Sequence, residues 1–375
     1  MRIAVDLTAL SDRFSGLERC ALELTEHMIR LAADDRFLLI VKNTPPAPVR
    51  MLGKRSNVRF LRIRGRNKLL ANQLSLAFAL ARAQADAVLF PVFPMPLLLP
   101  FLRRDLPVYG VIADTVCFDL PETMRPLQRL FWQVGLRCEA GHAAGIITVS
   151  EFSAGRIQKH LKVPEDRITV APNGVKIAAE DGPEGETEAE RKGRRDKTLA
   201  RYGISKPYFL TLSTIEPRKE IPLLIRAYRE LKSEGVKLPE LVIAGRSGWM
   251  DETEDAEGIR RTGFVEEKDL AAVYAGAEAF IFPSRYEGFG LPPLEALSCG
   301  VRRVLVSDAP ALREVMGDTA RYFKRHDLAS LKAALRELVS GQAEEAGEDA
   351  VRKNLERFSW EKSAERVRME ITHGE

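Results

Sequence analysis

The sequence predicts an α/β protein of two domains, each a parallel sheet covered by helices. Strand-like and helix-like segments alternate along the chain, as in βαβ units, and the alternation stops in a polar, charged stretch and then restarts. The length of 375 residues also exceeds one typical core. We therefore predict a first domain over 1–175, a mobile surface insertion over 176–200 and a second domain over 201–358. Residues 359–375 are expected to form a helix that packs back on the first domain.

The first domain is expected to supply most of the strands. Apolar runs typical of buried parallel strands lie at residues 2–7, 37–42, 58–63, 87–90, 107–112, 145–149 and 168–171. Helical patterns lie at 17–31, 68–84, 124–143 and 152–161. Because ligands of such sheets lie beyond the carboxyl ends of the strands, the loops there are the candidate site.

The second domain repeats the rhythm. Its strand candidates are residues 207–213, 240–244, 278–282 and 302–307. Its helix candidates are 220–234, 267–275, 292–298 and 327–341, and a final helix covers Trp360 to Ile371.

The composition limits the classes of partner. The net charge of +4 is too small to indicate nucleic acid. The four cysteines lack CxxC spacing, which favours reduced thiols in a cytoplasmic protein. The chain enters a strand at Arg2, so no signal peptide is expected, and no apolar run reaches the length of a membrane span. There is no DxD motif and the five histidines are dispersed, so we expect no catalytic metal.

The most informative stretch is Ser284 to Gly300, which follows an apolar run. Gly288 and Gly290 allow a tight turn close to a ligand, and Pro292-Pro293 suits the first turn of a helix. A strand, a glycine turn and a helix N-terminus together make an anion site. Glu287 and Glu295 bracket it as acceptors for sugar hydroxyls. The alternative is an ordinary βα unit with a surface acid and a capping acid.

A second motif, Glu216-Pro217-Arg218-Lys219, lies between a strand and a helix. Two adjacent cations there would neutralise the developing charge of a diphosphate leaving group. The alternative is an exposed basic pair. Two further polar loops, 245–249 and 261–265, are expected to border a nucleotide.

Three loops of the first domain each allow two interpretations. Gly16 precedes a helix and serves either a structural turn or a phosphate contact. Asp114 follows the fifth strand and either caps the next turn or acts in the site. Residues 148–153 contain three hydroxyl residues and an acid, which form a helix cap or a ligand contact.

A basic stretch, 50–68, leads into an amphipathic helix and then the apolar loop 91–101, which is followed by Arg103-Arg104. This combination is typical either of solvated surface or of a face that docks on an anionic membrane.

These residues together resemble glycosyltransferase family 4. The resemblance spans nearly the whole chain and rests most on Glu287-x7-Glu295 within Tyr-Glu-Gly-Phe-Gly-Leu-Pro, with support from Glu216–Lys219 and the Gly16 loop. The segments at 148–153, 172–175 and 307–308 also match. It implies the GT-B fold, in which two Rossmann-like domains face each other across a cleft.

The resemblance also implies roles. Arg218 and Lys219 would hold the donor diphosphate, Glu295 the ribose hydroxyls and Glu287 the donor sugar, with Asp114 completing the catalytic group. The set implied to bind the donor is Gly16, Arg218, Lys219, Arg246, Val265, Glu287, Gly288, Phe289, Gly290, Leu291 and Glu295. The implied reaction is metal-independent transfer of a hexose with retained configuration, as in bacterial mannosyl- and rhamnosyltransferases of surface polysaccharide and lipopolysaccharide synthesis. GDP-mannose is the first choice of donor, and the expected acceptor is a lipid-linked or polysaccharide chain. The expected location of the protein is the cytoplasm, at the inner face of the plasma membrane.

Three positions depart from the family pattern. Ala113 stands where relatives carry a histidine, and its methyl group can neither donate a hydrogen bond nor hold charge. Glu220 replaces an asparagine, and Gly300-Val301-Arg302 replaces Gly-x-Pro. Ala113 leaves two alternatives: a transferase in which Asp114 and its neighbours compensate, or a donor-binding protein with little or no turnover. A sugar-nucleotide epimerase of the same fold is a third, which the Tyr-Glu-Gly-Phe-Gly motif disfavours.

Overall fold

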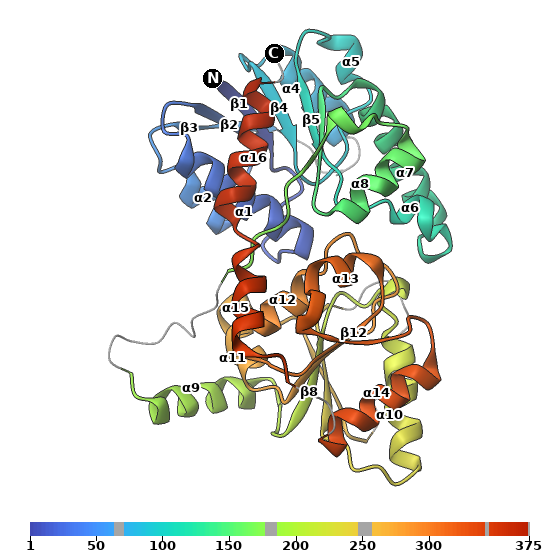
Figure 1. Ribbon diagram of the computed structural model, residues 1–375. Coiled ribbons are helices and arrows are strands. Elements are labelled where there is room, and N and C mark those ends of the chain that lie inside the picture. Colours follow the sequence, from blue (N-terminus) through green and yellow to red (C-terminus); the bar gives the residue numbers. More distant parts are fainter. Residues whose placement is uncertain (64–70, 177–185, 247–256, 342–344, 374–375) are drawn as a thin grey trace. The chain divides into compact units, whose positions relative to one another are not determined.

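The computed structural model describes residues 1–63, 71–176, 186–246, 257–341 and 345–373 (Figure 1). The chain divides into two compact units. Unit 1 comprises Met1–Gly174 together with Ser359–Glu375, and unit 2 comprises Val175–Phe358. Each is described on its own.

The described residues of unit 1 form a sheet of seven parallel strands in the order β3-β2-β1-β4-β5-β6-β7. The strands are β1 (Arg2–Asp6), β2 (Arg36–Lys42), β3 (Val58–Ile63), β4 (Ala87–Phe90), β5 (Val108–Val111), β6 (Gly145–Thr148) and β7 (Ile168–Val170). All seven strands expected from the sequence are confirmed. Ile3 and Val5 of β1 enter one core cluster and Ala4 the other, so both faces of the strand are buried.

Helices cover both faces of this sheet. Its helical segments are α1 (Gly16–Leu31), α2 (Ala47–Leu52), the π-helical turn η1 (Ala71–Ser75), α4 (Leu76–Arg82), α5 (Leu99–Leu102), α6 (Val116–Asp119), η2 (Pro121–Thr123), α7 (Pro126–His142), α8 (Glu151–Leu161), η3 (Glu165–Arg167) and α16 (Trp360–His373). The chain returns as α16 to pack against α1 (Figure 1). Trp360, Ala364 and Val367 of α16 are buried in the core cluster on that face. The first residues of the helix expected over 68–84 lie outside the described part.

Unit 2 has a sheet of six parallel strands among its described residues, in the order β10-β9-β8-β11-β12-β13. They are β8 (Tyr208–Leu212), β9 (Glu240–Ala244), β10 (Ile259–Gly263), β11 (Ala279–Phe282), β12 (Val304–Ser307) and β13 (Arg321–Phe323). The four expected strands are confirmed. The loop expected over 261–265 is wrong in its first half, because Arg261, Thr262 and Gly263 belong to edge strand β10. That strand is half-exposed and therefore lacks a continuous apolar run.

The helical segments of unit 2 are α9 (Glu188–Arg201), η4 (Pro217–Lys219), α10 (Ile221–Ser233), α11 (Glu267–Ala275), α12 (Leu291–Ser298), α13 (Pro310–Met316), η5 (Gly317–Thr319), α14 (Leu328–Ser340) and α15 (Glu348–Glu356). The expectation of a mobile surface insertion over 176–200 is wrong for residues 188–200, which form α9 within unit 2. A capping box between Thr187 and Glu190 starts this helix, and Leu199 anchors it. Residues 177–185 lie outside the described part.

No helix among the described residues is long and apolar enough to cross a bilayer.

Candidate functional site

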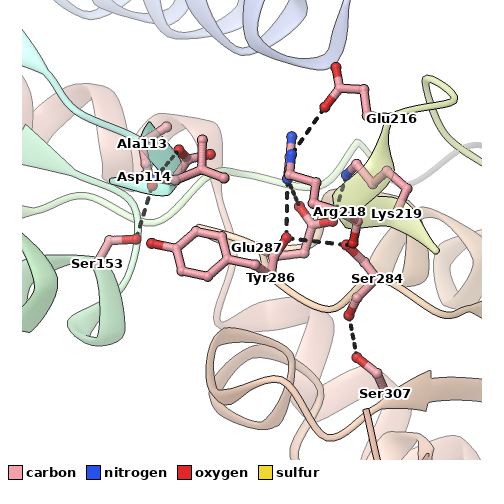
Figure 2. A network of polar contacts seen from close by, with 11 residues as sticks. Ala113, Asp114, Ser153, Glu216, Arg218, Lys219, Ser284, Tyr286, Glu287 and Ser307 are labelled. Atoms are coloured by element: carbon pink, nitrogen blue, oxygen red, sulfur yellow. Dashed lines mark hydrogen bonds and ion pairs between the residues drawn. The ribbon is translucent and has the colours of Figure 1, made fainter. Parts of the chain in front are cut away.

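In unit 2, the loops that follow β8, β11 and β12 are bound to one another at the carboxyl edge of the sheet (Figure 2). The Arg285 N–H donates to the Arg218 carbonyl at 2.8 Å. The Ser284 hydroxyl lies 3.1 Å from the Tyr286 carbonyl, and the Ser307 hydroxyl donates to the Ser284 carbonyl. The structure thus brings together the two motifs that the sequence analysis singled out.

Glu287 lies at the centre of this network, between the two adjacent cations. Its Oε1 is 2.5 Å from Lys219 Nζ and its Oε2 is 3.2 Å from Arg218 Nη1. Arg218 also donates to the Tyr286 carbonyl at 3.1 Å and pairs with Glu216 at 3.0 Å. Glu287 is 7% exposed and Lys219 is 9% exposed, so the expectation of an exposed basic pair does not hold for Lys219.

Burial and charge act in opposite directions on the carboxylate. Desolvation raises the pKa of Glu287, but the charges of Lys219 and Arg218 outweigh it, so the net shift is downward and the carboxylate is ionised at neutral pH. Burial, together with the like charge of Arg218, lowers the pKa of Lys219. The two carboxylates, Glu216 and Glu287, balance the two cations. An anion bound here would therefore share the cations with the carboxylates and would need further positive potential nearby.

The glycine turn and α12 supply that potential. Gly290 has φ +98°, and a Cβ there would lie 2.3 Å from Leu312 Cδ2, so this position admits only glycine. Leu291 then begins α12, with Pro292 and Pro293 in its first turn. No described side chain caps this helix, whose dipole is directed at the turn.

Glu295 lies inside α12, and the Tyr274 hydroxyl donates to its Oε2 at 2.9 Å. Tyr274 comes from α11 and its ring packs on Phe280 of β11 at 5.6 Å between centroids. The carboxylate is thus held in one orientation, as an acceptor for a pair of hydroxyls requires.

Arg246 offers its side chain to the site, whereas Val265 offers only its backbone. The Arg246 guanidinium stacks 5.0 Å from the centroid of the Phe264 ring, and its carbonyl accepts from the Ile215 N–H at 3.0 Å. Arg246 Nη2 is buried without a hydrogen-bond partner among the described residues, which leaves it available to a ligand. Val265 is buried, so only its backbone is a candidate for contact. Residues 247–249 lie outside the described part.

In unit 1, the Gly16 loop is a capped helix start. Ser15 accepts from the Glu18 N–H at 3.3 Å, and the Glu18 carboxylate accepts from the Ser15 N–H at 2.6 Å. A Cβ on Gly16 would meet no atom within 4 Å, and Gly16 has no positive φ, so no structural turn requires glycine there. The Glu18 carboxylate places negative charge at the same helix end, which opposes a phosphate at that point.

The loop after β5 carries Ala113 and Asp114. Asp114 Oδ1 accepts from the Val116 N–H at 3.1 Å, which is the capping interpretation of this residue. The Ser153 hydroxyl donates to the Ala113 carbonyl at 2.9 Å (Figure 2). Ser150 caps α8 by accepting from the Ser153 N–H at 3.1 Å. These contacts fix the loop, and residues 148–153 act as the expected helix cap.

Sequence reasoning gave no role to Ser284 inside the predicted stretch, and it missed Tyr274, which bonds Glu295, and Phe358, whose ring packs against Phe289. The hydroxyl of Ser284, directly before the motif, was a readable signal because it follows a strand end. Tyr274 and Phe358 gave no signal, since each reaches the site from a different element.

Both halves of the chain match family models of glycosyltransferases. Residues 14–179 match Glycosyltransferase Family 4, and residues 195–356 match Glycosyl transferases group 1. The O-antigen chain mannosyltransferase B of Escherichia coli is 35% identical over 66% of this chain and 65% of its own length. The GDP-mannose-dependent alpha-(1-6)-phosphatidylinositol monomannoside mannosyltransferase of Mycolicibacterium smegmatis is 27% identical over 66% of this chain and 65% of its own length. The chain therefore aligns with slightly less than two thirds of each of these relatives.

Among solved structures, Anabaena Alr3699/HepE in complex with UDP-glucose superposes with a TM-score of 0.73 at 15% identity, over 100% of both chains. This similarity concerns the fold, which is the GT-B fold with two Rossmann-like units that the resemblance implied.

Proposed function

Because the chain belongs to glycosyltransferase family 4, we propose that it transfers a hexose from a nucleoside diphosphate sugar to an acceptor of cell-envelope glycan synthesis. The observation that supports this most is the contact of Arg218 and Lys219 with Glu287 beside the turn before α12. Fixed cations and a helix N-terminus suit a diphosphate leaving group, and carboxylates held in one orientation suit sugar hydroxyls.

In the proposed reaction each site residue has one task. Arg218 and Lys219 bind the diphosphate and stabilise the charge it gains as the bond between the sugar carbon and the phosphate oxygen breaks. Glu295 accepts from the ribose hydroxyls and Glu287 from the donor sugar. The acceptor oxygen bonds to the same face of the sugar carbon, and its proton passes to the leaving diphosphate, so that the configuration is retained.

We favour mannose as the sugar and GDP as the nucleotide. Both relatives compared above are named mannosyltransferases, and one is named as GDP-mannose-dependent. The acceptor we propose is a lipid-linked or polysaccharide chain, at the inner face of the plasma membrane. Two fixed cations next to the diphosphate support a reaction without a divalent metal, so EDTA is expected to leave turnover unchanged.

The test is release of nucleoside diphosphate from a panel of sugar nucleotides, with and without a membrane lipid extract as acceptor. Release from one donor, fastest with the extract, would establish transfer and name the sugar. Binding of none of the donors would overturn the proposal.

Ala113 favours a second candidate, a protein that binds the donor without transferring the sugar. The Ala113 carbonyl is held by Ser153, and its methyl group stands where the family resemblance implies a histidine. Donor binding without release, followed by release from Ala113→His, would support this candidate. Release by the wild-type chain would exclude it.

A further inference from the structure

The chain passes between its two units at Gly174–Val175 and again at Phe358–Ser359. The two passages are hydrogen-bonded to each other, because the Val175 N–H donates to the Phe358 carbonyl at 3.2 Å. They are also closely packed: a Cβ on Gly174 would lie 2.2 Å from the Trp360 backbone nitrogen. A movement of one passage therefore displaces the other.

The same passages contact the glycine turn and α12 of the candidate donor site. Phe358 packs edge-on against Phe289 of the glycine turn, with ring centroids 5.3 Å apart and planes at 89°. At the other end of α12, the Ser298 hydroxyl lies 2.8 Å from the Glu295 carbonyl and 3.4 Å from the Lys176 carbonyl. Residues next to one passage thus touch the glycine turn, and residues next to the other touch the helix that carries Glu295.

The Phe289–Phe358 contact is tightly packed. Phe289 is 5% exposed and Phe358 is 6% exposed. The Arg357 guanidinium stacks 4.8 Å from the centroid of the Phe358 ring and is itself held by the Asn354 side chain at 2.8 Å. In a close-packed interior, a shift of the Phe289 ring must move Phe358 or open a void.

We propose that Phe358 is a positioning residue that couples donor binding at the 288–290 turn to the two interdomain passages. Phe289 is the anchoring side chain between two glycines, so its ring sets the conformation of the turn. The ring in turn rests on the last residue before the second passage. Since coupling between two sites is reciprocal, donor bound at the turn restrains the passages, and the passages tune the affinity for donor. The identity of the ligand rests on the proposed function, whereas the link from Phe289 through Phe358 to the passages does not.

The first test needs no ligand. Phe358→Leu keeps an apolar side chain but removes the edge-on ring contact. Hydrogen exchange followed by mass spectrometry is expected to show at least threefold faster exchange over 284–291 in this variant. The matched control is Phe323→Leu, a buried phenylalanine of β13 in the same unit. The control is expected to lose thermal stability similarly while exchange over 284–291 is unchanged. Equal exchange over 284–291 in the Phe358→Leu variant and the wild type would overturn the proposal.

The second test adds GDP-mannose, GDP and UDP-glucose as probes. In the wild type, a bound probe is expected to slow exchange both at 284–291 and at the passages, 173–176 and 357–360. In the Phe358→Leu variant the affinity is expected to fall threefold to tenfold and the protection of the passages to be lost. Protection of the turn with no response at the passages in the wild type would overturn the coupling and leave the proposed function standing. If no probe protects 213–220 or 284–291, the proposed function fails, while the ligand-free test still decides the link.

Discussion

At the scale of single residues, Glu287 is both a site residue and a structural one. Removing its carboxylate leaves Lys219 buried without its closest partner. Because an uncompensated buried charge is costly, Glu287→Ala is expected to lower the free energy of unfolding by about 3 kcal/mol. Urea denaturation measures this loss of unfolding free energy. Glu230→Ala, which breaks the half-exposed pairs with Arg226 and Lys332, is the control, with a clearly smaller expected loss because solvent screens these pairs. Equal losses would show that burial does not matter at Glu287.

Glu139 gives the protein a pH dependence that is independent of the donor site. This carboxyl lies in the core of unit 1, accepts from the Met95 N–H at 3.2 Å, and fills the space beside Gly110. Desolvation raises the pKa of Glu139 to about 8. The folded state therefore holds a proton that the unfolded state has released, and stability falls as the pH rises from the unfolded pKa of about 4.5 toward 8.

Glu139→Gln removes this titration and is expected to reduce the loss of stability with rising pH. Burial raises the pKa of Asp6 to about 6. Asp6 is therefore largely ionised above pH 6.5, and between pH 6.5 and 8 the titration of Glu139 can be followed apart from that of Asp6. From pH 6.5 upward the free energy of unfolding of the variant should gain about 1.4 kcal/mol per pH unit relative to the wild type, and about half of that slope remains as the pH reaches 8. Urea denaturation at several pH values measures this difference. Parallel profiles for the two proteins would mean that Glu139 is ionised in the folded state.

At the scale of elements, the junction between η4 and α10 is strained. Glu220 forms the N-cap of α10 with φ +51° and no capping hydrogen bond from its side chain. Its Oε1 contacts His326, whose φ is also positive at +59°. Its Oε2 is buried without a partner among the described residues.

Glu220→Asn is expected to stabilise the protein by about 1 kcal/mol, because asparagine tolerates this backbone conformation and caps helices well. Thermal denaturation measures the gain. Lys162→Asn is the reference, since Lys162 has φ +58° at the end of α8 and no comparable partner is being removed. A clear loss of stability in Glu220→Asn alone would show that the contact with His326 outweighs the strain.

The elements that could be predicted from the sequence are those with strong apolar periodicity. The buried strands of both sheets were readable because parallel strands covered on both faces are continuous apolar runs. Edge strands β10 and β13 were missed because charged residues such as Arg260 and Arg321 occupy them. Helix α9 was missed because its stability comes from a capping box and charged helix formers, and hardly from an apolar face.

The meeting of Arg218, Lys219 and Glu287 could likewise be foreseen, because both loops leave the carboxyl edge of one parallel sheet. The contacts of Glu295 with Tyr274 and of Phe289 with Phe358 could not. They depend on how helices and chain passages pack, which periodicity does not determine.

At the scale of the whole molecule, unit 1 presents an apolar and basic surface on α4 and α5. Phe78, Leu98, Phe101 and Leu102 are exposed there, with Phe101 at 73%, and α4 packs against α5. Arg104 follows directly and is exposed. We propose that this surface docks on an anionic membrane, which would bring the protein to the proposed lipid-linked acceptor.

Phe101→Ser is expected to reduce binding to phosphatidylglycerol vesicles at least threefold in a sedimentation assay, with little binding of either protein to phosphatidylcholine. Leu127→Ser is the control, because Leu127 is 83% exposed on α7 of the same unit. Equal losses in both variants would place the docking surface elsewhere, and no binding by the wild type would exclude membrane docking through this surface.

Nucleoside diphosphate release by Arg218→Ala decides whether the donor diphosphate is held where we propose. Arg218 contacts Glu216, Glu287 and the Tyr286 carbonyl, and loss of a cation at a developing charge typically costs about 10²–10³ in rate. We expect a fall of that size with the donor that the wild type uses, against less than about twofold for Arg226→Ala on the surface of α10. Undiminished release from Arg218→Ala would contradict the assignment of the donor site.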